Sequence, residues 1–145
     1  MDTQALRLEH SSIIGFASRL GGVAGDVKTR GDAHDARALI LTIDDMLQGH
    51  LAEEDAELYP ALMAAPDAET RTLGISAFEE MGCVVGAWVN YRDHWTLDAI
   101  LGDPRRFAGT TKGVIGALSL RIEMENDILY PAMDRLTAGR GLAAA

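Results

Sequence analysis

The segments "HLAEEDAELYP" (His50–Pro60) and "RIEMENDILYP" (Arg121–Pro131) are two copies of one pattern. At an offset of 71 residues, the first copy contains five identities over residues 54–61, including the glutamate and the Leu-Tyr-Pro triplet. The same offset places Leu47 on Leu118. The chain is therefore expected to contain one helical hairpin twice, with a histidine opening the first copy and an arginine opening the second.

Apolar residues recur at steps of three and four along four stretches, which is typical of amphipathic helices. The stripes run through residues 6–20, 39–58, 78–95 and 114–129. No stretch of the sequence alternates apolar and polar residues for long enough to predict a β-sheet. The pattern predicts an all-α, up-down-up-down four-helix bundle over residues 1–138, followed by a flexible tail over residues 139–145.

Glycine, proline and aspartate mark the breaks between these helices. Residues 25–33 are expected to form a loop, and Pro66 with Asp67 suits a break and a new N-cap. In "LGDP", Asp103 suits an N-cap and Pro104 a first helical turn. The prolines of the two Leu-Tyr-Pro triplets are expected to kink or stop their helices, because proline lacks a backbone donor.

Composition narrows the class of protein. The chain has 145 residues, enough to bury a core without disulfides, and a formal net charge of −9, which argues against nucleic-acid and anionic-membrane partners. Its single cysteine, Cys83, cannot form an intramolecular disulfide. It is expected to be a small buried apolar residue, the alternative being a redox sensor, which no second thiol is present to resolve. The N-terminus lacks a signal-peptide pattern, and no apolar run is long enough to span a membrane, so a cytoplasmic location is expected.

Four polar residues lie on the apolar stripes, which point toward the interior of the bundle. His50 and Glu54 are four residues apart, so their side chains share one helix face, about 6 Å apart along the axis. His10 lies on the stripe of the first helix and Glu125 on that of the fourth. Two imidazoles and two carboxylates form a suitable ligand set for a first-row transition metal. The alternative is that both histidines are core residues satisfied by hydrogen bonds.

The segment "LRLEH" with His10, the segment His50–Pro60, and the second acidic Leu-Tyr-Pro segment together resemble the hemerythrin or HHE cation-binding family, over about Leu6 to Pro131. The resemblance implies a four-helix bundle holding two carboxylate-bridged irons with terminal histidines from all four helices. Members bind oxygen, handle iron, or respond to oxygen, nitric oxide or redox conditions. By motif position, the resemblance implies that His10 and His50 are terminal ligands of one metal.

By the same comparison, Glu54 and Glu125 would be the bridging carboxylates. The chain departs from the family pattern at Arg121, which stands where the family has its fourth-helix histidine, and at Met81, which corresponds to His10 in the repeat. We therefore expect one metal position to be kept and the other lost. The expected cofactor is iron, or another divalent transition metal such as manganese or zinc, as one or two ions or none.

The sequence allows two roles each for Glu80 and Arg121, which are expected to lie near this site. Glu80 is either an additional ligand or a polar residue at the rim. Arg121 can fork onto Glu54 and Glu125 and take the place of a cation, which would leave a metal-free interaction or regulatory module with the same fold. His94 lies about 21 Å along the helix axis from Glu80, too far to serve the same centre.

The predicted function is metal-based sensing or handling of iron, oxygen or redox state, with a metal ion and a small diatomic molecule as partners. No nucleophile–base pair, phosphate loop or cofactor fingerprint indicates an enzyme, beyond incidental redox reactivity of bound iron. Trp88, Tyr91 and Trp95 form an aromatic stripe that is either core or, where exposed, the face for a homodimer or protein partner.

The remaining polar and aromatic candidates are expected to be structural. His34 and His94 are expected to be solvated. Tyr59 and Tyr130 are expected to pack at the ends of the kinked helices.

Overall fold

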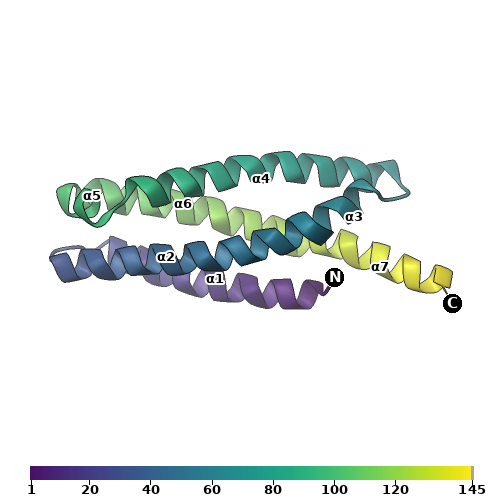
Figure 1. The fold of residues 1–145 in the computed structure, drawn as a ribbon, viewed down its shortest axis with the longest axis horizontal. Helices are drawn as coiled ribbons and strands as arrows, with labels where there is room; N and C mark the ends of the chain where they lie inside the picture. The colour runs from purple at the N-terminus through teal and green to yellow at the C-terminus, as the bar shows by residue number, and fades with distance from the viewer. Residues whose placement is uncertain (145) are drawn as a thin grey trace.

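The structure, a computed structural model, describes residues 1–144 and confirms an all-α bundle without strands in that range. Consecutive long helices run in opposite directions, so the order is up-down-up-down (Figure 1). The long helices are α1, α2, α4 and α6, and short elements continue or connect them. The elements are α1 (Thr3–Ala24), α2 (Arg30–Glu53), η1 (Glu54–Leu58), α3 (Tyr59–Met63), α4 (Ala68–His94), α5 (Leu97–Gly102), α6 (Pro104–Met124), η2 (Glu125–Leu129) and α7 (Tyr130–Ala144).

Side-chain caps start the helices where the sequence predicts breaks. The Asp67 side chain accepts from the backbone N–H of Thr70, and Asp103 caps α6 with Pro104 in the first turn. Thr29 and Asp32 form a reciprocal capping box, so α2 begins inside the segment predicted to be a loop. The loop between α1 and α2 is therefore shorter than predicted, because the capping box starts the helix at Arg30.

Each of the two copies contains one wide π-helical turn, η1 or η2, at equivalent positions 71 residues apart. The backbone N–H of Tyr59 donates to the carbonyl of Glu54, and that of Tyr130 donates to the carbonyl of Glu125. A proline follows each tyrosine, and its ring would clash with a carbonyl four residues earlier in a regular α-helix. The wide turn lets each helix continue beyond the proline instead of stopping there.

Two apolar clusters fill the bundle, with a polar layer between them. One cluster, toward the α5 end, includes Leu47, Trp88 and Leu118, and the other includes Leu58 and Leu129. His50 and Glu54 lie between Leu47 and Leu58 along α2 and η1, and Arg121 and Glu125 lie between Leu118 and Leu129 along α6 and η2. The helices therefore position a buried polar group inside an otherwise apolar core.

The aromatic stripe of α4 belongs to the core, and the alternative of an exposed partner face is wrong. Trp88, Tyr91 and Trp95 are only 3%, 4% and 3% exposed. The Trp88 indole N–H donates to Asp44 at 2.9 Å, and the hydroxyls of Tyr91 and Thr111 lie 2.7 Å apart. These contacts satisfy the polar atoms of the stripe inside the bundle.

The middle of α4 is its least buried part. Among the residues of this helix, none between Ala77 and Trp88 is fully buried. Cys83 is exposed, so the prediction that it is buried was wrong. At about 100° per residue, Cys83 lies about 120° from Ala77 and about 140° from Trp88 around the helix, on the side facing solvent.

Helix α7 includes most of the range that the sequence predicts to be a flexible tail. Helix α7 continues past Gly139 to Ala144, and Ala145 lies outside the described residues. The segment contains alanine and leucine, which favour helix, and no proline that would end it.

No helix in the described part of the chain has the length and apolar character needed to cross a bilayer.

Candidate metal centre

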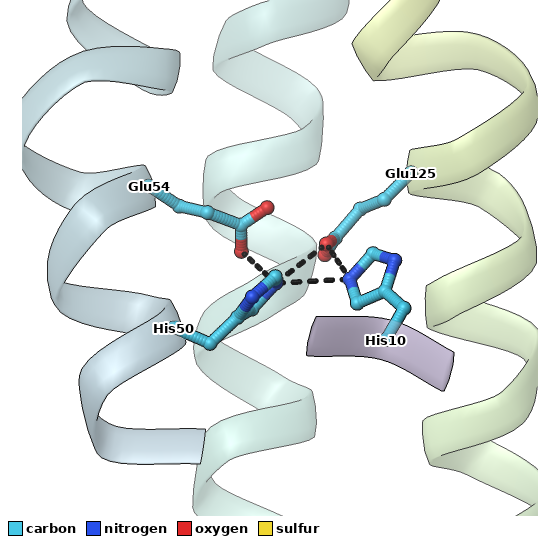
Figure 2. A group of neighbouring side chains, drawn as sticks. All are labelled: His10, His50, Glu54 and Glu125. Atoms are coloured by element: carbon cyan, nitrogen blue, oxygen red, sulfur yellow. Dashed lines mark hydrogen bonds and ion pairs between the residues drawn. The ribbon is translucent and has the colours of Figure 1, made fainter. Parts of the chain in front are cut away.

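Four buried side chains from α1, from the continuous helix α2–η1 and from η2 meet in the polar layer (Figure 2). His10 comes from α1, His50 from the last turn of α2, and Glu54 and Glu125 are the first residues of η1 and η2. Each offers one ligand atom, and these atoms lie within 4.8 Å of one another. All four residues are at most 2% exposed. The structure therefore brings together the four ligands predicted from the sequence.

The donor atoms are as close as ligands of one ion. The two Nε2 atoms of His10 and His50 lie 2.9 Å apart, and His10 Nε2 is 3.0 Å from Oε1 of Glu125. His50 Nε2 is 3.5 Å from Oε1 of both Glu54 and Glu125. Two atoms bound to one metal by bonds of about 2.1 Å lie about 3.0 Å apart at a right angle.

The hydrogen-bond chemistry of the site also fits a cation. Nδ1 of His10 lies 2.7 Å from Oδ1 of Asn126, so the ring donates its Nδ1–H to that carbonyl and leaves Nε2 as a lone pair in the neutral form. Oε1 of Glu54 is fully buried and has no hydrogen-bond partner. A buried acceptor without a donor is costly, and a metal ion at this position would satisfy it.

Electrostatics show the same need for positive charge. Burial by itself lowers the pKa of His50, but the neighbouring carboxylates of Glu125 and Glu54 outweigh it and raise the pKa to about 10. Burial raises the pKa of Glu54 above its usual range. Burial also acts to raise the pKa of Glu125, but hydrogen bonds from His10 and His50 hold it well below its usual range. In the metal-free protein, His50 therefore carries a proton in the place of a cation.

Arg121 makes one of its two predicted contacts, the one with Glu125. Its Nε donates to Oε2 of Glu125 at 2.8 Å, while Nη2 donates to the hydroxyl of Tyr59 at 2.6 Å. It makes no hydrogen bond or ion pair with Glu54 among the described contacts, so that part of the prediction was wrong. The tyrosine hydroxyl takes the second arm of the guanidinium. Arg121 is 6% exposed and supplies a permanent charge beside the four ligands.

Sequence reasoning missed the polar roles of two tyrosines. The hydroxyl of Tyr59 binds Arg121, and that of Tyr130 donates to Oε2 of Glu54 at 3.0 Å. Both were expected only to pack at helix ends. Their identity in both copies of the repeat was the available signal, since packing alone would have tolerated other apolar residues.

Two other residues support the histidine rings or stand near them. Asn126 follows Glu125 directly and binds Nδ1 of His10, a contact that the sequence did not indicate. Oε2 of Glu9 lies 3.7 Å from Nδ1 of His50, in the position of an ion-pair partner when that ring is protonated. Such outer partners fix the orientation of metal-binding imidazoles.

The remaining sequence candidates lie outside the cluster. Glu80 is exposed on α4 and borders a groove of about 320 Å³ that is also lined by Arg121. Met81 is partly buried against the apolar cluster that contains Leu58 and Leu129. His34 and His94 are exposed, as predicted. Helix α4 contributes none of the four clustered ligands.

Comparison with known proteins identifies the family. The description "Hemerythrin HHE cation binding domain" belongs to the family whose sequence profile matches residues 1–133, most of the chain. Searches of curated proteins and of solved structures gave no significant match. The buried cluster of two histidines and two glutamates is consistent with a cation-binding domain. The chain belongs to the hemerythrin HHE cation-binding domain family.

Proposed function

We propose that the chain binds one first-row transition-metal ion, with iron as the first choice, through His10, His50, Glu54 and Glu125. The supporting observations are the convergence of four buried donor atoms within 4.8 Å and the buried Oε1 of Glu54, which has no hydrogen-bond partner. Imidazole and carboxylate ligands suit iron, manganese and zinc. The bound ion would supply Lewis-acid character and, if it is iron, one-electron redox chemistry.

The proposed role is sensing or handling of iron, oxygen or a related diatomic molecule, without catalysis, in the cytoplasm. Arg121 occupies the side of Glu125 away from the histidines, where its Nε binds Oε2. Its fixed charge repels a second dication and cannot act as a ligand. One ion per chain is therefore proposed instead of the pair that the family resemblance implies.

A metal-free interaction module is the second candidate, and the buried Arg121–Glu125 pair favours it. That pair neutralises one carboxylate at 2.8 Å without any ion. It leaves the buried Oε1 of Glu54 without a hydrogen-bond partner, however, and a metal ion would account for that atom. The two candidates differ in whether the purified protein holds a metal.

Metal counting tests the proposal. Chelator-treated protein is loaded anaerobically with Fe(II), and in parallel with Mn(II) or Zn(II), then desalted and analysed by mass spectrometry. We expect about one ion per chain in the wild type and much less in His10→Ala and His50→Ala, because loss of a ligand opens a coordination position.

His34→Ala and His94→Ala are the matched controls, since both histidines are exposed and lie outside the cluster. They should bind as much metal as the wild type. Equal metal content in all four variants would reject the ligand assignment. A wild type that binds no tested metal would favour the metal-free module, and two ions per chain would show that Arg121 does not block a second position.

A further inference from the structure

The hydroxyl of Tyr130 lies at the centre of the ligand cluster, in contact with every proposed ligand. Its oxygen is 3.0 Å from Oε2 of Glu54 and 3.2 Å from Oε1 of Glu125. It is also 3.2 Å from Nε2 of His10 and from Nε2 of His50. The side chain is fully buried.

A phenol cannot satisfy all four contacts. It has one proton, which it donates to Oε2 of Glu54 at the shortest of the four distances. A protonated His50 can donate to the phenol oxygen, but Oε1 of Glu125 and Nε2 of His10 remain as two further acceptors at 3.2 Å, which the single phenol proton cannot also serve. The four distances of 3.0–3.2 Å are instead those of a donor atom that shares one metal ion with its neighbours, at bond lengths of about 2.1 Å.

We propose that Tyr130 is a further metal ligand and binds the ion as a phenolate, an inference that rests on the proposed metal site. On binding, the O–H bond of Tyr130 breaks, its proton passes to solvent, and the electron pair of the oxygen forms the bond to the ion. No oxidation state changes in this step.

Charge in the buried layer supports the assignment. A divalent ion and the Arg121 guanidinium together bring three positive charges against the two carboxylates of Glu54 and Glu125. One phenolate makes this group formally neutral. Uncompensated charge is expensive at a site this deeply buried, so a neutral group is favoured.

The π-helical turn η2 explains how Tyr130 reaches the site. Five residues of regular α-helix rotate by about 500°, which would place Tyr130 about 140° around the helix from Glu125. The hydrogen bond from the Tyr130 N–H to the Glu125 carbonyl closes a wider turn, which contains one more residue than an α-helical turn. This turn brings the side chains of Glu125 and Tyr130 toward one face of the helix. In the other copy, the equivalent Tyr59 binds Arg121 instead.

The test uses all three tyrosines of the chain, each changed to phenylalanine. Wild type, Tyr130→Phe, Tyr59→Phe and Tyr91→Phe are loaded with Fe(III), and metal content, visible absorption and resonance Raman spectra are recorded. We expect a phenolate-to-Fe(III) charge-transfer band in the wild type and in Tyr91→Phe, whose hydroxyl binds Thr111 in the other cluster. Tyr130→Phe should lose the band and weaken metal binding by at least about tenfold, but keep a far-ultraviolet circular dichroism spectrum like that of the wild type.

Each other outcome identifies which assignment is wrong. Iron bound by the wild type without a phenolate band would overturn the role of Tyr130 and leave the metal site standing. A band lost in Tyr59→Phe and kept in Tyr130→Phe would assign the ligand to the other copy of the repeat. If the wild type binds no metal at all, both the proposed function and this inference fail.

Discussion

At Arg121 the two halves of the repeat differ in chemistry. The first copy has a histidine there, which presents Nε2 to the cluster, and the second has a guanidinium that binds Glu125 and Tyr59. A histidine can lose its proton and bind a metal through the freed nitrogen, whereas an arginine keeps its proton and its charge. One substitution therefore turns a ligand position into a fixed cation.

The stability of the metal-free protein should depend on this cation. Arg121→Ala leaves Oε2 of the buried Glu125 without its ion-pair partner, so we expect the free energy of unfolding in urea to fall by about 3 kcal/mol. Arg92→Ala is the matched control, because its pair with Asp44 is partly exposed and should contribute less than about 1 kcal/mol. Equal losses in both variants would show that Arg121 is not a buried counter-ion.

The sequence was sufficient to identify the two histidines and two glutamates of the cluster, but not the hydroxyls beside them. A histidine or a glutamate on an apolar stripe is chemically conspicuous, because burying it is costly without a partner. A tyrosine on such a stripe is ordinary, and the direction of its hydroxyl depends on local backbone geometry. For Tyr59 and Tyr130 that geometry is a π-helical turn, which a periodicity of 3.6 residues does not reveal.

At the scale of the helices, the sequence predicts the caps and the apolar stripes. It does not predict where two helices pack so closely that only glycine fits between them. Gly74 and Gly86 are both glycines within α4 and look equivalent in the sequence. A Cβ added at Gly74 would lie 2.7 Å from Cβ of Leu62 on α3, whereas one added at Gly86 meets nothing within 4 Å. Only the first glycine is required by packing.

Alanine substitution should therefore have opposite effects at these two positions. Gly74→Ala forces α3 and α4 apart and is expected to lower the free energy of unfolding by about 1–3 kcal/mol, although alanine favours helix. Gly86→Ala should raise it by about 0.5–1 kcal/mol through helix propensity alone. Urea unfolding of the two metal-free variants measures both. If Gly74→Ala is also stabilising, the contact between α3 and α4 yields to a methyl group and does not fix their spacing.

At the scale of the whole molecule, the polar layer links α1, α2 and the η2 end of α6 between two apolar clusters. In the metal-free protein, the layer needs a proton on His50, whose pKa is raised to about 10 from an ordinary 6.5, by neighbouring carboxylates that outweigh the effect of burial. A group with a raised pKa stabilises the fold fully below its unfolded value, and this contribution is lost as the pH rises toward the folded value. On the proposed assignment, a bound metal would replace that proton, because imidazole binds metals only in its neutral form.

The pH dependence of stability should therefore differ between the two forms. Between pH 7 and pH 9, we expect the free energy of unfolding of chelator-treated protein to fall by about 2 kcal/mol, since the folded state holds the His50 proton and the unfolded state does not. Over the same range, metal-loaded protein should not lose stability, because its His50 is already neutral. Urea titrations of both forms at the two pH values measure the difference. A parallel fall in both would mean that the metal does not displace the His50 proton and is bound somewhere else.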